Sequence, residues 1–169
     1  LYTGATPDFV DINLESYTID VVKLEEKLLF YKEKGKSVKS VIGVDYAGHP
    51  CNWKELRKLA NKYNFTLIND NCHAMGSRID NQKDYACKFA DITTQSYHPV
   101  KHITTGEGGA VLTNHKGISE KVNTLRSHGI VKDNSNHNSA EGPWFYEMLE
   151  LGFNYRITDI QCALGINQL

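Results

Sequence analysis

The stretch TTQSYHPVKHITTGEGGAVLTN, residues 93–114, carries the strongest structural pattern in the chain. Its opening residues belong to a run with many β-branched side chains, which favours a strand over Asp91–Ser96. A turn that contains Pro99 follows, and Lys101 then precedes a glycine-rich stretch that leads into apolar residues. Those apolar residues favour a second strand over Gly109–Thr113. The stretch therefore predicts a lysine-bearing loop between two strands.

Strands and helices are predicted to alternate through the rest of the chain. In chain order we expect a strand over 8–13, a helix over 20–34, a strand over Val38–Asp45, a helix that begins after Asn52, a strand over Phe65–Ile68 and a polar helix over about 116–127 that ends before Gly129. The final residues, ALGINQL, look like part of a further helix. Alternation of this kind predicts an α/β domain with a mostly parallel sheet flanked by helices.

Apolar side chains at helical spacing support the first two helices. They are Val21, Leu24, Leu28 and Tyr31 in the first helix and Trp53, Leu56, Ala60 and Tyr63 in the second. The second helix also has a start signal, because Asn52 can cap it with Glu55 at the third helical position. Each helix therefore has one apolar face for packing.

The composition is that of an ordinary globular domain. Of 169 residues, 40% are hydrophobic and 23% charged, and the formal net charge is -1, so there is no basic surface for nucleic acid. No apolar run approaches the roughly 20 residues of a membrane span, and no signal-peptide pattern opens the sequence. We therefore expect a cytoplasmic protein that binds neither nucleic acid nor membrane.

The four cysteines do not form a metal or disulfide pattern. Cys51, Cys72, Cys87 and Cys162 are widely spread and never occur as CxxC. We expect reduced thiols, mostly in the core, and no metal site.

Three polar residues lie at or just past predicted strands, where open α/β sheets bind ligands. They are Asp45, Asp70 and Ser96. Alone, an acid at a strand end is more often a turn former or a helix cap, and a lysine in a turn is more often a solvated charge. These residues become candidates for chemistry only through their context.

Two common reaction classes lack their motifs in this context. The phosphate-binding pattern GxxxxGK[ST] is absent, and no GxGxxG follows a strand. The serine-hydrolase pattern GxSxG is also absent, because Ser96 stands between Gln95 and Tyr97. Nucleotide hydrolysis and serine-dependent acyl transfer therefore have no support.

Four ordered segments together resemble one enzyme family. They are GATPDFVDIN (4–13), NDNCHAMGS (69–77), SYHPVKHITTGEGGAV (96–111) and LGFNYRITDIQCALGINQL (151–169). This combination resembles the DegT/DnrJ/EryC1/StrS sugar aminotransferases, a branch of the fold-type-I enzymes that use pyridoxal 5′-phosphate (PLP). The resemblance implies that residues 1–169 are part of a PLP-binding large domain, with an N-terminal segment and a small C-terminal domain absent.

The resemblance implies a role for each matching residue, and the residue types suit PLP chemistry. Lys101 matches the lysine that holds the cofactor covalently and then moves the substrate proton. Asp70 matches the carboxylate that keeps the pyridine nitrogen protonated. Ser96 matches a hydroxyl donor to the cofactor phosphate, and His73 matches a residue placed against the ring. A partly buried histidine with ordinary partners is an equally good interpretation of His73.

Two residues near the C-terminus carry further expectations from the resemblance. Asn154 matches a residue that reaches the cofactor phosphate of the partner subunit, which implies a homodimer with shared active sites. Arg156 also matches a family position, and we expect it to have a structural role.

The loops resemble one subgroup of the family. RSHGIVKDN (126–134) and GPWFYEMLELGFNYR (142–156) are similar to enzymes of pseudaminic acid synthesis, which implies transfer from an amino-acid donor, L-glutamate, to C4 of a UDP-linked 4-keto-6-deoxy-N-acetylhexosamine. We expect a surface loop over 131–143, and Trp144, Phe145 and Tyr146 either cover the substrate or anchor that loop. The alternatives are a related aminotransferase with other regiochemistry and a binding module of the same fold without catalysis.

Overall fold

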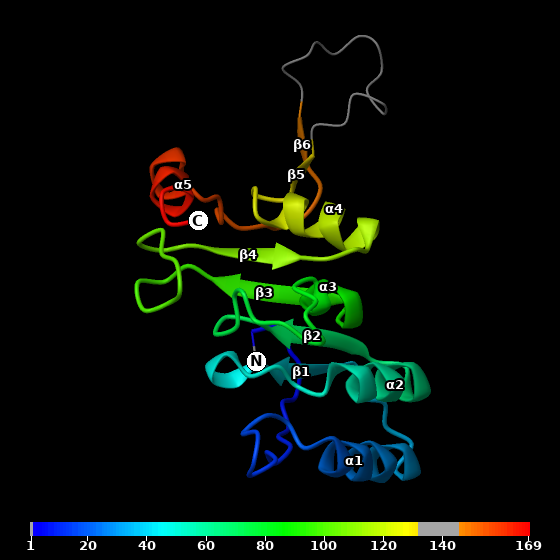
Figure 1. The fold of residues 1–169 in the computed structure, drawn as a ribbon. Coiled ribbons are helices and arrows are strands. Elements are labelled where there is room, and N and C mark those ends of the chain that lie inside the picture. The colour runs from blue at the N-terminus through cyan, green and yellow to red at the C-terminus, as the bar shows by residue number, and fades with distance from the viewer. Residues whose placement is uncertain (1, 132–145) are drawn as a thin grey trace.

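A four-stranded sheet forms the centre of the computed structural model, which describes residues 2–131 and 146–169. The strand order is β1 (Ser40–Val44), β2 (Thr66–Asp70), β3 (Ile92–Ser96) and β4 (Gly109–Leu112) (Figure 1). The pairs β1–β2 and β2–β3 are parallel, whereas β4 runs antiparallel to β3. The predicted α/β fold with a mostly parallel sheet is confirmed. Strand β4 is reversed because its connection to β3 contains no helix, and a parallel return needs a crossover.

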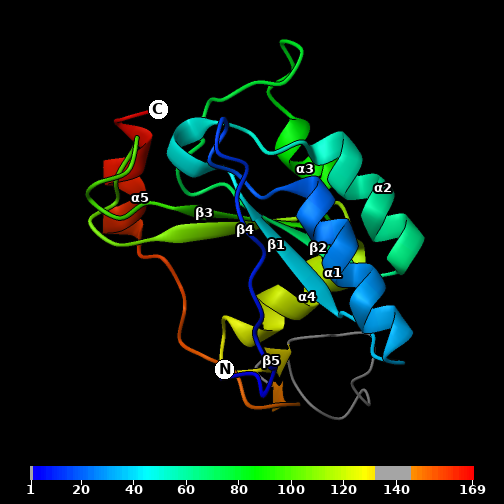
Figure 2. The same cartoon turned by 90° about the horizontal axis from the view of Figure 1, so that it is seen from below.

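Three helices cover one side of the sheet. They are α1 (Val21–Glu33), α2 (Trp53–Tyr63) and the short α3 (Tyr85–Phe89), which the sequence pattern did not predict. Figure 2 shows them together on one side, with α4 (Lys116–Leu125) on the other. The core between these helices and the sheet consists mainly of Leu24, Leu28, Val41, Trp53, Leu56, Leu59, Phe65, Leu67 and Tyr85. Both predicted apolar helix faces thus contribute to one core.

The opposite face of the sheet is open among the described residues. Along β1, Val41 and Gly43 are buried on the helix side, whereas Ile42 and Val44 are 57% and 40% exposed on the other. In β4, Val111 is 43% exposed on this same side. The alternation of strand side chains therefore gives the sheet one packed face and one accessible face.

Side-chain caps fix the predicted helix starts. Asp20 accepts hydrogen bonds from the N–H groups of Val22 and Lys23, at 2.8 and 3.0 Å, and Asn52 accepts from the N–H of Glu55 at 3.4 Å. The cap at Asn52 is the one that the sequence predicted. After α4 the chain forms the short pair β5 (Ile130–Val131) and β6 (Glu147–Met148), and it closes with α5 (Asp159–Ile166).

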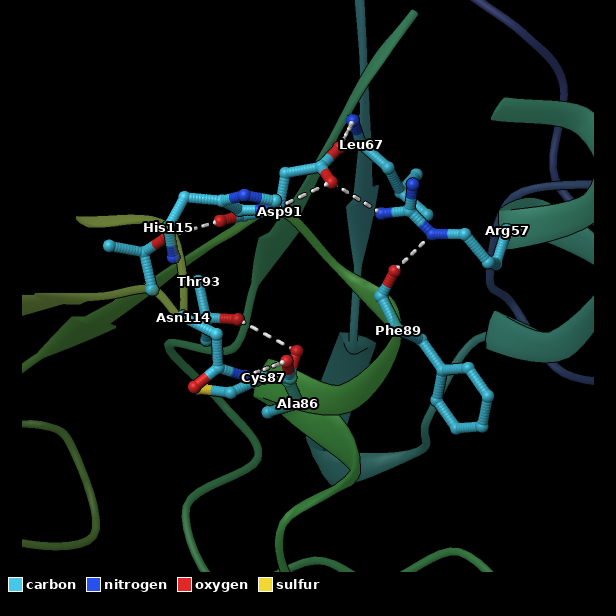
Figure 3. Close-up of polar contacts among 10 residues, drawn as sticks. Arg57, Leu67, Ala86, Cys87, Phe89, Asp91, Thr93, Asn114 and His115 are labelled. Atoms are coloured by element: carbon cyan, nitrogen blue, oxygen red, sulfur yellow. Dashed lines mark hydrogen bonds and ion pairs between the residues drawn. The ribbon is translucent and has the colours of Figure 1, made fainter. Parts of the chain in front are cut away.

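A single carboxylate joins four elements at the edge where β3 begins. Asp91 accepts from the N–H of Leu67 at 2.7 Å, pairs with Arg57 of α2 at 2.9 Å and contacts His115, next to α4, at 3.3 Å (Figure 3). Its own carbonyl accepts from the hydroxyl of Thr113, which follows β4, at 2.6 Å. Asp91 therefore stabilises the end of the sheet that lies away from Asp70.

Two expectations are wrong. Residues 8–13 form no strand; Ile12 makes only an isolated bridge to Ile19, and the segment is held to α1 because Asp8 accepts hydrogen bonds from Tyr31 and Lys27. The second wrong expectation is that most of the cysteines lie in the core. All four are free, but only Cys51 is buried. Cys72 follows the end of β2, whereas Cys87 and Cys162 lie within α3 and α5, and all three are partly exposed.

The described part of the chain has no helix with the length and apolar character needed to cross a bilayer. It also contains no group of three His, Cys, Asp or Glu side chains close enough to bind a metal ion together.

Candidate active site

The carboxyl ends of β2 and β3 bring Asp70 and Ser96 to the open face of the sheet. Asp70 pairs in register with Thr94, and Ser96 lies two residues further along β3, so all three side chains point to the same side. Val44 of β1 pairs with Asp70 on the other flank. Strand β2 extends two residues beyond its predicted end, and Asp70 is therefore the last residue of the strand.

Lys101 lies in the loop between β3 and β4, and main-chain hydrogen bonds close this loop. The N–H of Tyr97 donates to the carbonyl of Gly108 at 2.9 Å, and the N–H of Thr105 donates back to the carbonyl of Tyr97 at 3.0 Å. The N–H of Lys101 itself donates to the carbonyl of His98 at 2.9 Å. The loop is therefore a defined turn that carries the lysine.

Asp70 and Lys101 both act on the thiol of Cys72. Burial raises the pKa of Cys72, the adjacent Asp70 carboxylate raises it further, and the Lys101 ammonium opposes this by lowering it. No described carboxylate forms an ion pair with the Lys101 ammonium, and Asp70 uses one oxygen to accept from the N–H of Cys72 at 3.1 Å. Lys101 lies five residues after the end of β3, the strand that pairs with β2 at Asp70, and no described carboxylate forms an ion pair with its amine.

Ser96 and His73 lie at the same edge. The hydroxyl oxygen of Ser96 accepts from the N–H of His98 at 3.3 Å, which leaves its own hydrogen available for donation. The His73 side chain is exposed, and its ring lies 6.1 Å from that of Tyr46, centroid to centroid. His73 is thus more exposed than a partly buried histidine would be, and its place against the cofactor ring stays a prediction.

Asp45 has a different role from Asp70 although it follows the neighbouring strand. It is fully buried and accepts hydrogen bonds from the N–H of Cys51, the indole of Trp53, the amide of Asn71 and the hydroxyl of Tyr85, at 2.9, 2.8, 3.0 and 2.9 Å. Burial and this carboxylate raise the pKa of Cys51 to about 12. Asp45 is therefore occupied by the protein itself and is not available for a ligand.

The Asp45 cluster continues toward the lysine loop. The Asn71 amide also contacts Tyr85, and its oxygen accepts from Gln95 at 3.4 Å. Gln95 in turn accepts from the hydroxyl of Tyr97 at 3.2 Å. The contacts of Asn71, Gln95 and Tyr97 were not predicted. They join residues from different strand ends, and no local sequence pattern indicates such contacts.

Among the described residues, no hydrogen bond links Asn154 to Asp70, Ser96 or Lys101. Asn154 is exposed and forms a bridge with Ser127 just after α4, where Phe153 and Tyr155 also bond to the main chain of Leu125 and Arg126. Arg156 is exposed too, and no described carboxylate pairs with it. The predicted loop over 131–143, with Trp144 and Phe145, lies outside the described residues apart from Val131, whereas Tyr146 is described and 56% exposed.

The residues at the edge suit PLP by their chemistry. A carboxylate, a hydroxyl and a primary amine match a pyridinium nitrogen, a phosphate and an aldehyde respectively. All three reach the accessible side of the sheet or the loop that borders it, whereas the helix side is filled by the core. Asp70, Ser96 and Lys101 are therefore the residues that could hold the cofactor.

An α/β sheet with a lysine loop beside an acidic strand end is the arrangement expected of a PLP-dependent aminotransferase. The chain belongs to the DegT/DnrJ/EryC1/StrS aminotransferase family, whose sequence profile matches residues 1–169. It is 43% identical over 169 residues to the UDP-4-amino-4,6-dideoxy-N-acetyl-beta-L-altrosamine transaminase of Campylobacter jejuni, covering 100% of this chain and 41% of that protein.

Solved structures agree with this assignment. Helicobacter pylori PseC, an aminotransferase involved in the biosynthesis of pseudoaminic acid, is 34% identical with a TM-score of 0.82, over 99% of this chain and 40% of that one. NtdA from Bacillus subtilis with bound cofactor PMP is 28% identical with a TM-score of 0.76, over 99% of this chain and 34% of that one. The chain thus spans about two-fifths or less of the length of these relatives.

Proposed function

We propose that the protein transfers an amino group from L-glutamate to C4 of a UDP-linked 4-keto-6-deoxy-N-acetylhexosamine, with residues 1–169 as part of its PLP-binding large domain. The observation that carries the proposal is the placement of Asp70 at the carboxyl end of β2 beside Thr94, with Ser96 at the end of β3 and Lys101 in the loop that follows. A lysine amine that no described carboxylate pairs with, in the loop next to an acidic strand end, suits PLP-dependent amino transfer.

Each residue has a distinct task in this proposal. PLP, when bound, supplies the electron sink that makes the substrate carbon acidic. The Lys101 amine anchors the cofactor, and once released it takes the proton from the substrate carbon and delivers it to the cofactor side. The Asp70 carboxylate keeps the pyridine nitrogen protonated, because a nearby negative charge favours the cationic form. Ser96 donates its hydroxyl hydrogen to the phosphate, and His73 borders the ring.

The substrate class is supported by the relatives. The Campylobacter jejuni protein is named for an amino sugar carried by UDP, and it matches this chain over its whole length. The solved structure of Helicobacter pylori PseC supports the same class of product. The NtdA structure, with bound PMP, supports the cofactor, because PMP is the aminated form of PLP.

The proposal also includes a homodimer in which Asn154 of one subunit reaches the cofactor phosphate of the other. Asn154 is exposed, and its bridge is to Ser127, so its side chain is accessible to a second subunit, which supports this part of the proposal.

A single-turnover assay of the full-length protein tests the proposed substrate. The enzyme is loaded with the aminated cofactor, and a panel of UDP-linked and other nucleotide-linked 4-keto and 3-keto sugars is added separately. We expect the UDP-linked 4-keto-6-deoxy-N-acetylhexosamine to restore the absorbance of the aldehyde form fastest. Faster discharge by a 3-keto or non-UDP sugar would favour a sibling aminotransferase, and no discharge by any sugar would favour a non-catalytic binding module.

A further inference from the structure

Helix α5 lies directly beside the returning limb of the lysine loop, residues 104–108, in both views of the fold (Figures 1 and 2). The side-chain amide of Gln161 donates to the carbonyl of Glu107 at 2.9 Å. The side-chain oxygen of Gln168, just past the end of the helix, accepts from the N–H of Thr104 at 2.8 Å. Two glutamines thus bind the two ends of the same limb.

The two ends of the Gln161 amide have separate partners. Its oxygen accepts from the N–H of Thr158 at 2.9 Å, and the hydroxyl of Thr158 accepts from the N–H of Gln161 at 3.3 Å, which forms a capping box at the start of α5. Its nitrogen donates to the loop. The helix cap and the loop contact can therefore be separated by one substitution.

A glycine permits the close approach of helix and loop. Gly165 is buried within α5, and a Cβ added there would lie 2.9 Å from the methyl carbon of Thr105. That distance is below normal carbon–carbon contact, so a larger residue would push the loop away. The helix therefore packs against the limb as well as bonding to it.

The returning limb, residues 104–108, is bonded to the start of the loop that carries Lys101. The N–H of Thr105 and the hydroxyl of Thr104 both donate to the carbonyl of Tyr97, at 3.0 Å each. They join the returning limb to the first residue after β3. The Lys101 amine has no ion pair among the described residues, so the backbone of its loop sets its position. We propose that α5 holds the loop in place and that Gln161 is a positioning residue for Lys101 through Glu107. This inference rests on the proposed function, because it assigns a purpose to the position of the lysine.

Two single variants of the full-length protein separate the loop contact from the helix cap. Gln161→Glu keeps an oxygen for the N–H of Thr158, and adds a negative charge that suits a helix start, but it removes the donor to Glu107. Thr158→Ala removes the capping hydroxyl, which also donates to the Gln161 oxygen at 3.0 Å, but it keeps the Thr158 N–H that donates to the same oxygen and keeps the amide donor to Glu107. The first variant therefore tests the loop, and the second is the matched control for helix stability.

The readout is the rate at which PLP attaches to Lys101. Apoprotein is mixed with PLP, samples are reduced with borohydride at intervals, and the labelled fraction of the Lys101 peptide is measured by mass spectrometry. We expect Gln161→Glu to label about five-fold more slowly than the wild type, as loss of one hydrogen bond implies. Hydrogen exchange over residues 97–108 should become faster in the same variant. Thr158→Ala should melt at a lower temperature yet label at the wild-type rate.

The outcomes distinguish the two proposals. If PLP does not label Lys101 in the wild type, the proposed function fails. If the wild type is labelled and Gln161→Glu has the same rate and the same hydrogen exchange, the positioning role of Gln161 is overturned. Equal slowing in both variants also overturns it, because α5 would then act through helix stability alone.

Discussion

The main-chain N–H of Asp45 donates to the main-chain carbonyl of Asp70 at 3.0 Å, although the carboxylates of these two residues point to opposite sides of the sheet. Asp45 is surrounded by four donors in the core, whereas Asp70 is directed to the accessible face beside Thr94. One acid therefore stabilises the strand ends, and the other remains available to a ligand.

Replacement of the buried acid should lower stability. Asp45→Asn places an amide NH₂ against groups that are themselves donors, so we expect a loss of about 3 kcal/mol in the free energy of unfolding, as for other broken buried polar networks. Urea unfolding of the full-length protein measures this. Asp84→Asn is the control, because Asp84 is exposed and makes no side-chain cap. Equal stability of the two variants would contradict the structural role of Asp45.

Replacement of the lysine should abolish amino transfer and leave the fold intact. Lys101 lies in a loop and its amine has no described ion-pair partner, so Lys101→Ala removes chemistry and little packing. Residual turnover should fall below about a hundredth of the wild-type rate, because loss of a covalent catalyst exceeds the roughly 10²-fold effect of a lost general base. The exposed Lys36→Ala serves as the charge-matched control. A variant with more activity than this threshold would exclude Lys101 as the anchor.

Replacement of the strand-end acid should weaken cofactor binding. Asp70→Asn keeps an oxygen for the N–H of Cys72, so the strand end should keep its shape, but the neutral amide no longer favours a pyridinium. We expect lower PLP retention on dialysis and lower turnover. Circular dichroism checks the fold, and unchanged retention and turnover would rule out the pairing with the pyridine nitrogen.

Mixed dimers should test the shared site. A Lys101→Ala subunit and an Asn154→Ala subunit are each expected to be inactive as homodimers, yet a heterodimer has one site with both wild-type residues and one with both lesions. Activity should therefore return on mixing, and each heterodimer should reach at most half of the activity of a wild-type dimer, because only one of its two sites is intact. If subunit exchange is verified and activity stays at the parental level, while Asn154→Ala alone is impaired, Asn154 acts within its own chain.

The thiol of Cys51 should resist alkylation at mildly alkaline pH. Burial and the Asp45 carboxylate raise its pKa from 9.0 to about 12, so the protonated form is favoured in the folded state. The stability that this provides is present below pH 9 and is lost as the pH rises toward 12, because the unfolded thiol ionises first. Iodoacetamide labelling at about pH 8.5, followed by peptide mass spectrometry, should modify Cys51 more slowly than the partly exposed Cys87 and Cys162.

Local patterns predicted most of the regular elements. Helix α1, helix α2 with its Asn52 cap, and strands β1, β3 and β4 fall within two residues of their expected bounds, because side-chain periodicity and caps act over short sequence distances. The strand predicted over residues 8–13 was wrong because long-range contacts decide the conformation of this segment. Their alternating pattern suits a strand, but Asp8 binds Lys27 and Tyr31 on α1 instead of a neighbouring strand.

The candidate site was predictable only in part. Asp70, Ser96 and Lys101 were predicted because strand ends and a family resemblance both pointed to them, and their roles stay predictions; the structure places Asp70 and Ser96 at the ends of neighbouring strands and Lys101 in the loop that follows β3. The Asp45 network and the contacts of Gln161 were not predictable, since each joins residues far apart in the sequence. Such contacts depend on tertiary packing, which no local pattern encodes.

The antiparallel return of β4 has a consequence for the order of folding. Its partner β3 precedes it along the chain by only the lysine loop, whereas β1 and β2 are joined through the whole of α2. Closing a short loop costs less chain entropy than closing a long one. Strands β3 and β4 can therefore pair without the long crossover that β1 and β2 need, whereas the loop between them gains its contacts with Gln161 and Gln168 only after α5 has been made.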